Sequence, residues 1–447
     1  MKIIIAGAYA IGTYLAKLLS RNDQDIVLID EDEERLGNVS SDYDLMTVHA
    51  SPTSVKALKD AGVGSADLFI GVTPDENMNM NSCIMAKALG AKKTVAKVNN
   101  YELIDPEPKA FLAKVGVDSL IYPENLAAYD IVNGLKMSWV RQRWDVHNGA
   151  LIMLGIKLRE MCEILNEPLK DLCKPESPYH IVAVKRGDDT IIPRGDDVLK
   201  IYDMAYFMTT RNYIPYIRKL VGKENYVDVK NVMVMGGGNT AIRAVQMIPE
   251  YMSTKIIEAD EKRCEQINEL VDTDKIMVIN GDGRDIPLLV EEGVKNIQAF
   301  VALTGNAETN ILACLTAKRL GVRKTIAMVE NMDYVKMAES LDIGTIINKK
   351  AIAASRIYQM MLDSDVNNTR FLMSANADVA EFTAQQDSKV TKKRVFELGL
   401  PHGTTIGGLV RNGEGILVSG GSQIEAGDIV VVFCHNVNMS KIEKFFN

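Results

Sequence analysis

An apolar run that ends in a glycine turn opens this chain and constrains its fold more than any other stretch. The run Lys2-Ile3-Ile4-Ile5-Ala6 leads into Gly7, a helical pattern begins at about Ile11, and a second apolar run ends at Asp30. A buried strand, a glycine turn, a helix and an acid roughly 20 residues on are typical of a dinucleotide-binding βαβ unit. The helix N-terminus favours a pyrophosphate, and the acid can accept hydrogen bonds from a ribose diol.

The same pattern occurs again in the second half of the chain. The run Val232-Met233-Val234-Met235 leads into Gly236-Gly237-Gly238, and Glu258 ends the next apolar run. Residues 86–98 and 317–329 are identical at eight of thirteen positions, at an offset of 231. One register kept over several landmarks indicates a tandem duplication, and the chain therefore has two candidate nucleotide sites.

The two glycine turns do not match the G-x-G-x-x-G/A pattern equally well. The second turn has all three small positions, the last of them Ala241, whereas Tyr9 stands where the first turn should have its second glycine. A side chain there crowds a phosphate pressed against the backbone, so either Tyr9 swings out or this site binds weakly, differently or not at all. The carboxylates of Asp30 and Glu258 favour NAD(H) over NADP(H), because a 2′-phosphate would meet like charge.

Further candidate positions lie at the expected carboxyl ends of the strands, where ligands of doubly wound sheets bind. Gly281 and Asp282 follow the third strand of the second half, where an adenine edge commonly lies, and the fourth strands end at Thr73-Pro74 and Thr304-Gly305. The candidate nucleotide-binding residues are Gly7, Ala8, Tyr9, Ala10, Ile11, Gly12, Asp30, Thr73, Pro74, Gly236, Gly237, Gly238, Asn239, Thr240, Glu258, Gly281, Asp282, Thr304 and Gly305.

Apolar runs that alternate with helical stretches predict an α/β fold with two Rossmann-like, doubly wound parallel-sheet domains. A small α+β unit of short strands and turns is expected after each of them. The predicted parts are a first Rossmann-like domain (1–122), a helical arm (123–145), a small domain (146–211), a helical linker (212–228), a second Rossmann-like domain (229–350), a second arm (351–366) and a second small domain (367–447).

Composition and residue spacing exclude several classes of function. The net charge of −8 disfavours nucleic acid as a partner. The sequence also lacks a run of about 18 uncharged apolar residues, which a membrane-spanning helix would need. The six cysteines form no C-x-x-C pair and the five histidines form no catalytic or metal-spaced array. We therefore expect a cytosolic protein with reduced cysteines and no catalytic residues or metal site, although an NAD-dependent oxidoreductase stays open as an alternative.

The order of these motifs resembles the TrkA family, the peripheral subunits of bacterial Trk potassium uptake systems. The resemblance covers essentially the whole chain. The residues that carry it are Met1 to Gly7, Val27 to Leu36, Gly236 to Asn239, Leu398 to Gly408 and Ala426-Gly427-Asp428.

The resemblance implies a regulator of potassium conductance, an RCK protein, built from tandem N- and C-terminal RCK domains. It implies that the Rossmann-like units bind NAD(H), or ATP or ADP, and that the chain forms a homo-oligomeric ring, a dimer or a tetramer. The ring would lie on the cytoplasmic face of the membrane beneath a TrkH-type channel subunit, without inserting in the bilayer. A ring subunit of another cation channel or antiporter stays open.

The chain departs from the family's usual pattern at a few positions. Tyr9, Ala10 and Ser51 replace the usual glycine, polar or acidic residue and aspartate of the first site. Lys97, a further candidate for nucleotide binding, takes the place of a usual arginine and keeps the charge without the planar fork.

Overall fold

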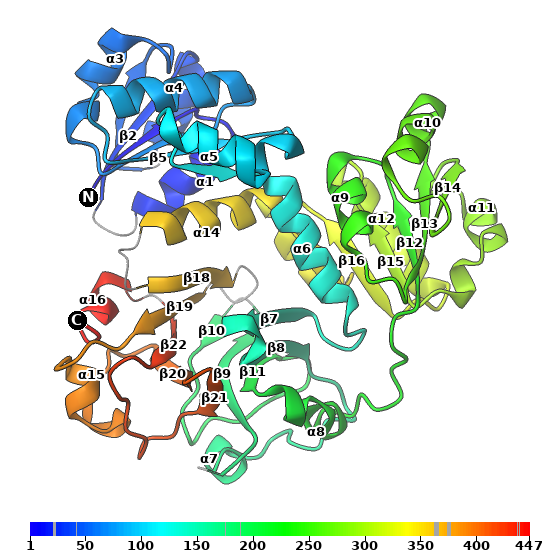
Figure 1. The fold of residues 1–447 in the computed structure, drawn as a ribbon. Coiled ribbons are helices and arrows are strands. Elements are labelled where there is room, and N and C mark those ends of the chain that lie inside the picture. The colour runs from blue at the N-terminus through cyan, green and yellow to red at the C-terminus, as the bar shows by residue number, and fades with distance from the viewer. Residues whose placement is uncertain are drawn as a thin grey trace. The chain divides into compact units, whose positions relative to one another are not determined.

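The computed structural model describes residues 1–447 except 21–23, 42, 175, 188, 362–365, 373–376, 436 and 438. The chain divides into two compact units, one made of residues 1–126 and 349–363 and the other of residues 127–348 and 364–447 (Figure 1). The first unit is a Rossmann-like domain, and the second unit holds another Rossmann-like domain and the two small domains. The predicted fold class is confirmed.

The first Rossmann-like domain is a parallel sheet with strand order β3-β2-β1-β4-β5-β6. Its strands are β1 (Lys2–Ala6), β2 (Asp25–Asp30), β3 (Met46–His49), β4 (Leu68–Gly71), β5 (Lys93–Lys97) and β6 (Ser119–Ile121). Its helices are α1 (Ala10–Leu19), α2 (Glu33–Ser40), α3 (Val55–Asp60), α4 (Glu76–Ala88), α5 (Pro106–Lys114) and the beginning of α6 (Pro123–Leu135).

Apolar layers cover both faces of this sheet. Ile3 and Ile5 point into one layer, and Ile4 points into the other, because side chains alternate along a strand. The first layer includes Ala353 and Ile357 of α14 (Lys349–Met361), which packs beside α1 (Figure 1). A helix that follows the second Rossmann-like domain in sequence therefore completes the core of the first.

The second Rossmann-like domain repeats this topology, with strand order β14-β13-β12-β15-β16-β17. Its strands are β12 (Asn231–Met235), β13 (Ser253–Glu258), β14 (Ile276–Asn280), β15 (Ala299–Ala302), β16 (Lys324–Met328) and β17 (Thr345–Ile347). Its helices are α9 (Asn239–Met247), α10 (Glu261–Leu270), α11 (Ile286–Glu291), α12 (Ala307–Arg319) and α13 (Met332–Ser340).

The two small domains also share one topology, with sheets of order β10-β9-β11-β8-β7 and β21-β20-β22-β19-β18. The first contains β7 (Gln142–Val146), β8 (Leu151–Lys157), α7 (Leu169–Leu172), β9 (Tyr179–Arg186), β10 (Asp189–Ile191), β11 (Met204–Thr209) and α8 (Ile214–Leu220). The second contains β18 (Val366–Leu372), β19 (Ala377–Thr383), α15 (Lys389–Lys392), β20 (Thr404–Arg411), β21 (Glu414–Leu417), β22 (Ile429–Cys434) and α16 (Met439–Glu443).

One arginine–aspartate fork recurs in both small domains. Arg186 donates from Nε and Nη2 to the carboxylate of Asp203 at 3.0 and 2.8 Å, and Arg411 binds Asp428 in the same way at 2.8 and 2.7 Å. The turn before each aspartate has positive φ, 69° at Tyr202 and 89° at Gly427. The non-glycine residue at 202 therefore keeps the turn of the repeat.

The structure differs from the sequence-based expectation after α6. The pattern predicts a continued helix or an arm over residues 133–144, but α6 ends at Leu135 and β7 begins at Gln142. Trp144 and Val146 are buried on alternate positions of β7, which pairs with β8. This segment forms a strand because it pairs with β8, which comes later in the chain. The apolar spacing within the segment alone does not indicate such a pairing.

No helix in the described part of the chain has the length and apolar character needed to cross a membrane.

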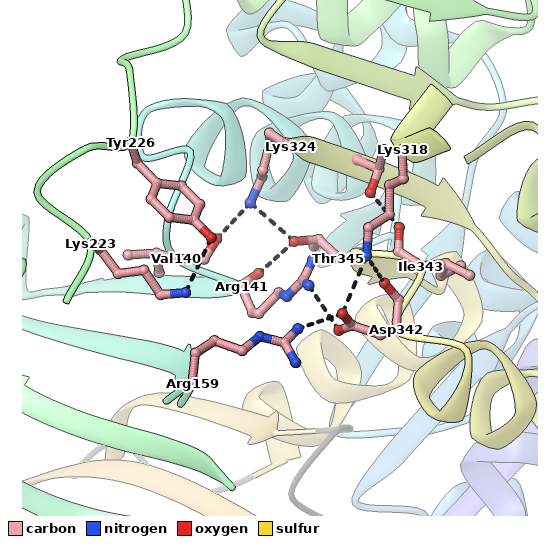
Figure 2. A network of polar contacts seen from close by, with 11 residues as sticks. Val140, Arg141, Arg159, Lys223, Tyr226, Lys318, Lys324, Asp342, Ile343 and Thr345 are labelled. Carbon is pink, nitrogen blue, oxygen red and sulfur yellow. Dashed lines mark hydrogen bonds and ion pairs between the residues drawn. The ribbon is translucent and has the colours of Figure 1, made fainter. Parts of the chain in front are cut away.

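A fully buried lysine joins the first small domain to the second Rossmann-like domain (Figure 2). Lys324 Nζ donates to the carbonyl oxygen of Val140 at 2.6 Å and to Thr345 Oγ1 at 3.1 Å, and Thr345 Oγ1 in turn donates to the carbonyl oxygen of Arg141 at 2.8 Å. Burial lowers the pKa of Lys324 well below its ordinary value, and the nearby Arg141 lowers this pKa further.

We expect the Lys324→Met variant to change how stability depends on pH. Between the depressed pKa of folded Lys324 and its ordinary value, the unfolded chain binds a proton that the folded chain does not, so the wild-type protein gains stability as pH rises. The variant lacks this gain. Thermal unfolding at several alkaline pH values should show the stability of wild type increasing relative to that of the variant as pH rises. A stability difference that does not change with pH would contradict a depressed pKa for Lys324.

Candidate functional site

The second glycine turn brings Glu258 against its own backbone. Gly236 has a φ of 97°, and its N–H donates to the carbonyl oxygen of Ile257 at 2.9 Å, which fixes the turn at the edge of the sheet. Gly237 N–H donates to Glu258 Oε2 at 2.6 Å, and Asp260 N–H donates to Oε1 at 2.9 Å. These contacts hold the carboxylate beside the turn, where it can accept hydrogen bonds from a ribose.

Arg263 supports this turn without binding the acid. Its Nε donates to the carbonyl oxygen of Gly237 at 2.8 Å, and its Nη2 lies 3.3 Å from Asn239 Oδ1. Among the described residues no cation lies within ion-pair distance of Glu258. Its carboxylate, which accepts two backbone hydrogen bonds, can therefore accept further hydrogen bonds from a ligand.

The first glycine turn repeats the contact between acid and backbone. Gly7 has a φ of 115°, and Ala8 N–H donates to Asp30 Oδ2 at 2.6 Å. Asp32 N–H donates to Asp30 Oδ1 at 2.9 Å, and Asp30 is buried. Each glycine turn therefore contacts the acid at the end of the next strand in both halves.

A stacked tyrosine and arginine distinguish the first site from the second. Arg35 Nη2 donates to Asp30 Oδ1 at 3.1 Å, and the Arg35 guanidinium carbon lies 4.0 Å from the centre of the Tyr9 ring. Both side chains line a cavity of about 150 Å³, together with Asp30, Thr73 and Pro74. The acid of the first site thus already has a cationic partner, and the cavity is smaller than the usual 300–1,000 Å³ of ligand pockets.

The helices that follow the two turns have free N-terminal donors. Neither α1 nor α9 has a side-chain hydrogen bond at its N-cap, whereas Asp32, Asp260 and Asn306 cap α2, α10 and α12. The first N–H groups of a helix have no partner within the helix and attract anions. Ala10 and Ile11 begin α1, and Asn239 and Thr240 begin α9, so these predicted residues lie at helix N-termini whose N–H groups can bind an anion.

The glycines of the turns have two different roles. A Cβ on Gly12 would lie 1.9 Å from the carbonyl oxygen of Gly7, and a Cβ on Gly237 would lie 2.3 Å from Ile267 Cδ1. A Cβ on Gly238 or Gly305 would meet nothing within 4 Å. Gly12 is therefore required for the close packing of α1 against the turn. The absence of a side chain at Gly238 instead leaves empty space beside the turn.

This difference predicts opposite results for two alanine variants. Gly12→Ala should destabilise the first Rossmann-like domain by about 3 kcal/mol, because the clash is with backbone. Gly238→Ala should cost less than about 1 kcal/mol of stability and yet weaken nucleotide binding, because its methyl group occupies the space of the pyrophosphate. Thermal unfolding and nucleotide titration of both variants would test this. Normal nucleotide affinity in a folded Gly238→Ala protein would contradict the assignment.

An asparagine organises the end of the fourth strand in each half. Thr73 N–H and Oγ1 both donate to Asn79 Oδ1 at 2.8 Å, and Asn79 Nδ2 donates to the carbonyl oxygen of Lys97 at 2.9 Å. Thr304 and Asn310 repeat these contacts at 3.0, 2.7 and 2.9 Å, with the carbonyl oxygen of Met328 as the last acceptor. The fourth strand, the following helix and the fifth strand are thereby joined at the edge where the turns lie.

The remaining predicted residues lie at the same edge or next to it. Gly281 N–H donates to the carbonyl oxygen of Glu258 at 2.9 Å, while the exposed Asp282 is held by Arg284, whose hydrogen bonds lower the pKa of Asp282 to about 2. Lys97 Nζ donates to Asn99 Oδ1 at 2.8 Å, and burial lowers the pKa of Lys97. Asp282 and Lys97 therefore have partners from neighbouring residues.

The sequence reasoning missed the two arginines and gave no role to the two asparagines. Arg35 and Arg263 each lie five residues after the acid of their turn, and Asn79 and Asn310 keep the offset of 231. The repeat offset was the available signal, because a polar residue retained in both halves of a duplicated chain marks a shared contact.

A family model described as the TrkA-N domain matches residues 3–123 and 232–349, and one described as the TrkA-C domain matches residues 379–447. The Trk system potassium uptake protein TrkA of Haemophilus influenzae is 29% identical, over 100% of this chain and 98% of that protein. A TrkA homolog of Archaeoglobus fulgidus is 27% identical, over 100% of both chains.

Solved structures show the same fold at low sequence identity. The GsuK RCK domain superposes with a TM-score of 0.59 at 15% identity, covering 100% of this chain and 94% of that one. The GsuK channel bound to NAD gives a TM-score of 0.60 at 14% identity, covering 100% and 78%. With TrkA-N matches in both halves and a TrkA-C match at its end, the chain belongs to the TrkA family of Trk system potassium uptake proteins.

Proposed function

We propose that this protein is the regulatory subunit of a Trk-type potassium uptake system and that it senses NAD(H) or a related adenine nucleotide. The relatives carry the name of Trk system potassium uptake proteins, and a structural neighbour was solved with NAD bound. Nucleotide binding at the glycine turns changes the conformation of the protein, and this change opens or closes a TrkH-type membrane channel subunit.

The observation that carries this proposal is the arrangement of Glu258 at the second turn. Its carboxylate is fixed by Gly237 N–H at 2.6 Å, has no ion-pair partner among the described residues, and lies beside the uncapped N-terminus of α9. A ribose diol and a pyrophosphate need such an acceptor and such donors at neighbouring positions. The second site is therefore the stronger of the two.

The protein acts by shape and not by catalysis in this proposal. It assembles as a dimeric or tetrameric ring at the cytoplasmic face of the membrane, where its channel partner holds it. The nucleotide is an effector that is bound and released unchanged. If the protein were an oxidoreductase, NADH absorbance would fall steadily on addition of carbonyl substrates.

Reconstitution tests the proposed function. The full-length chain and a TrkH-type subunit are placed in liposomes, and potassium flux is followed while NADH, ADP or ATP is added. We expect at least one nucleotide to change the flux with the wild-type chain and not with Glu258→Ala. A flux that ignores every nucleotide would contradict the proposal, and so would a chain that does not co-purify with the membrane subunit.

A further inference from the structure

A second polar cluster lies away from both glycine turns, where the first small domain meets the second Rossmann-like domain. It surrounds a cavity of about 170 Å³. The walls come from the strands of the small domain, from α13 and from the beginning of β17. Because Thr345 begins β17 and the glycine turns follow the carboxyl ends of strands, this cavity lies at the opposite edge of the sheet from the nucleotide site.

Positive charge exceeds negative charge around this cavity. Asp342 binds Arg141 Nη2 at 2.9 Å and Lys318 Nζ at 3.2 Å, and it also pairs with Arg159 (Figure 2). Glu339 binds Lys185 Nζ at 2.5 Å. Lys157 and Lys336 line the cavity as well.

Lys157 is the unsatisfied member of this cluster. It is half-buried at the end of β8, and within the described residues no hydrogen bond or ion pair is formed by its ammonium group. Burial lowers the pKa of Lys157 and of Arg141, Asp342 raises both values in part, and Arg159 lowers both. Cations withdrawn from water without enough counter-charge are costly, and a bound anion removes this cost.

We propose that this cavity is a second binding site, specific for a phosphate-sized oxyanion that Lys157, Arg141 and Lys336 hold. The cavity is below the 300–1,000 Å³ of sites for drug-sized ligands, so it admits a single phosphate group and not a whole dinucleotide. Guanidinium and ammonium groups bind such a dianion through charge-assisted hydrogen bonds. The group is supplied either by inorganic phosphate or by the terminal phosphate of a nucleotide whose remainder stays outside.

Titration of the full-length protein with inorganic phosphate, at constant ionic strength, tests this site. We expect saturable binding to wild type, at least tenfold weaker binding to Lys157→Gln and to Lys336→Gln, and unchanged binding to Lys219→Gln. Lys219 is an exposed lysine of α8 that serves as the matched control, since its replacement changes the net charge equally. Lys336 is exposed, so its variant keeps the test valid if Lys157→Gln does not fold.

The source of the phosphate group is resolved by competition. In the Asp30→Ala/Glu258→Ala double variant, ATP that displaces inorganic phosphate identifies a nucleotide phosphate as an occupant, and ATP that leaves it bound identifies free phosphate. The absence of saturable phosphate binding to wild type would overturn the proposal, and so would equal affinity of wild type, Lys157→Gln and Lys336→Gln. The proposed nucleotide sensing would stand in either case, because it rests on the other edge of the sheet.

Discussion

The Glu258→Ala variant will bind NADH more than about 100-fold more weakly than wild type at the second site. Hydrogen bonds to a charged group contribute about 1.5–3 kcal/mol each, and the variant loses the bonds from both ribose hydroxyls. It also frees Gly237 N–H, which now donates to Glu258 Oε2 at 2.6 Å, so the turn loses its anchor. Calorimetric titration of the full-length chain with NADH measures the change.

The control for this variant is Glu261→Ala, which removes the same charge from an exposed position in the first turn of α10. Its NADH affinity should equal that of wild type. The matching change in the first half, Asp30→Ala, should have a smaller effect, since Arg35 already occupies Asp30 Oδ1. Equal losses in Asp30→Ala and Glu258→Ala would rule out the inequality of the two sites.

The Tyr9→Gly variant will gain nucleotide binding at the first site, by about tenfold or more. The change restores the second glycine of the turn, so a pyrophosphate can approach bare backbone. It also removes the ring on which the Arg35 guanidinium lies at 4.0 Å, a contact of about 0.5–2 kcal/mol, and thereby weakens the hold of Arg35 on Asp30.

This gain is measured in the Glu258→Ala background, where the second site contributes little. Tyr14→Gly would destabilise α1 and is no substitute, so the matched control is Tyr251→Gly, which replaces an exposed tyrosine in a turn outside the helices. Affinity for NADH should rise in Tyr9→Gly and stay unchanged in Tyr251→Gly. If both variants bind NADH as weakly as the Glu258→Ala parent does, Tyr9 and Arg35 do not obstruct the first site.

The difference between the two sites limits the free energy that nucleotide binding can supply for a conformational change. Moving a two-state equilibrium from 1:99 to 99:1 needs about 5.5 kcal/mol of differential binding. One site whose acid is already paired, as Asp30 is with Arg35, supplies little of this energy. Identical strong sites in each chain of a ring can supply it together, so assembly and sensing depend on each other in this proposal.

The sequence predicted much of the fold because its signals are local and repeated. Apolar runs, glycine turns and a constant offset predicted two Rossmann-like sheets and two small domains, and the turn–acid contacts of Ala8 with Asp30 and Gly237 with Glu258 are in place. The sequence also identified Tyr9 as the departure from the pattern, without showing what the ring contacts.

Contacts between residues far apart in the chain could not be predicted in this way. Arg141 and Asp342 are separated by 201 residues, and nothing near either one indicates the other. The packing of α14 on α1 depends on the return of the chain to its first domain. The position of Arg35 over Tyr9 depends on the rotamers of two side chains, which a residue pattern does not specify.

The proposed function requires that the protein bind an adenine nucleotide through the acids of its two glycine turns. Equilibrium titration of the purified wild-type chain and of the Asp30→Ala/Glu258→Ala double variant, with NADH, ADP and ATP in turn, tests this requirement. We predict saturable binding of at least one of these nucleotides to wild type, and none to the double variant when excess inorganic phosphate fills the cavity beside Lys157. A wild-type chain that binds no adenine nucleotide, or a double variant that binds like wild type, would contradict it.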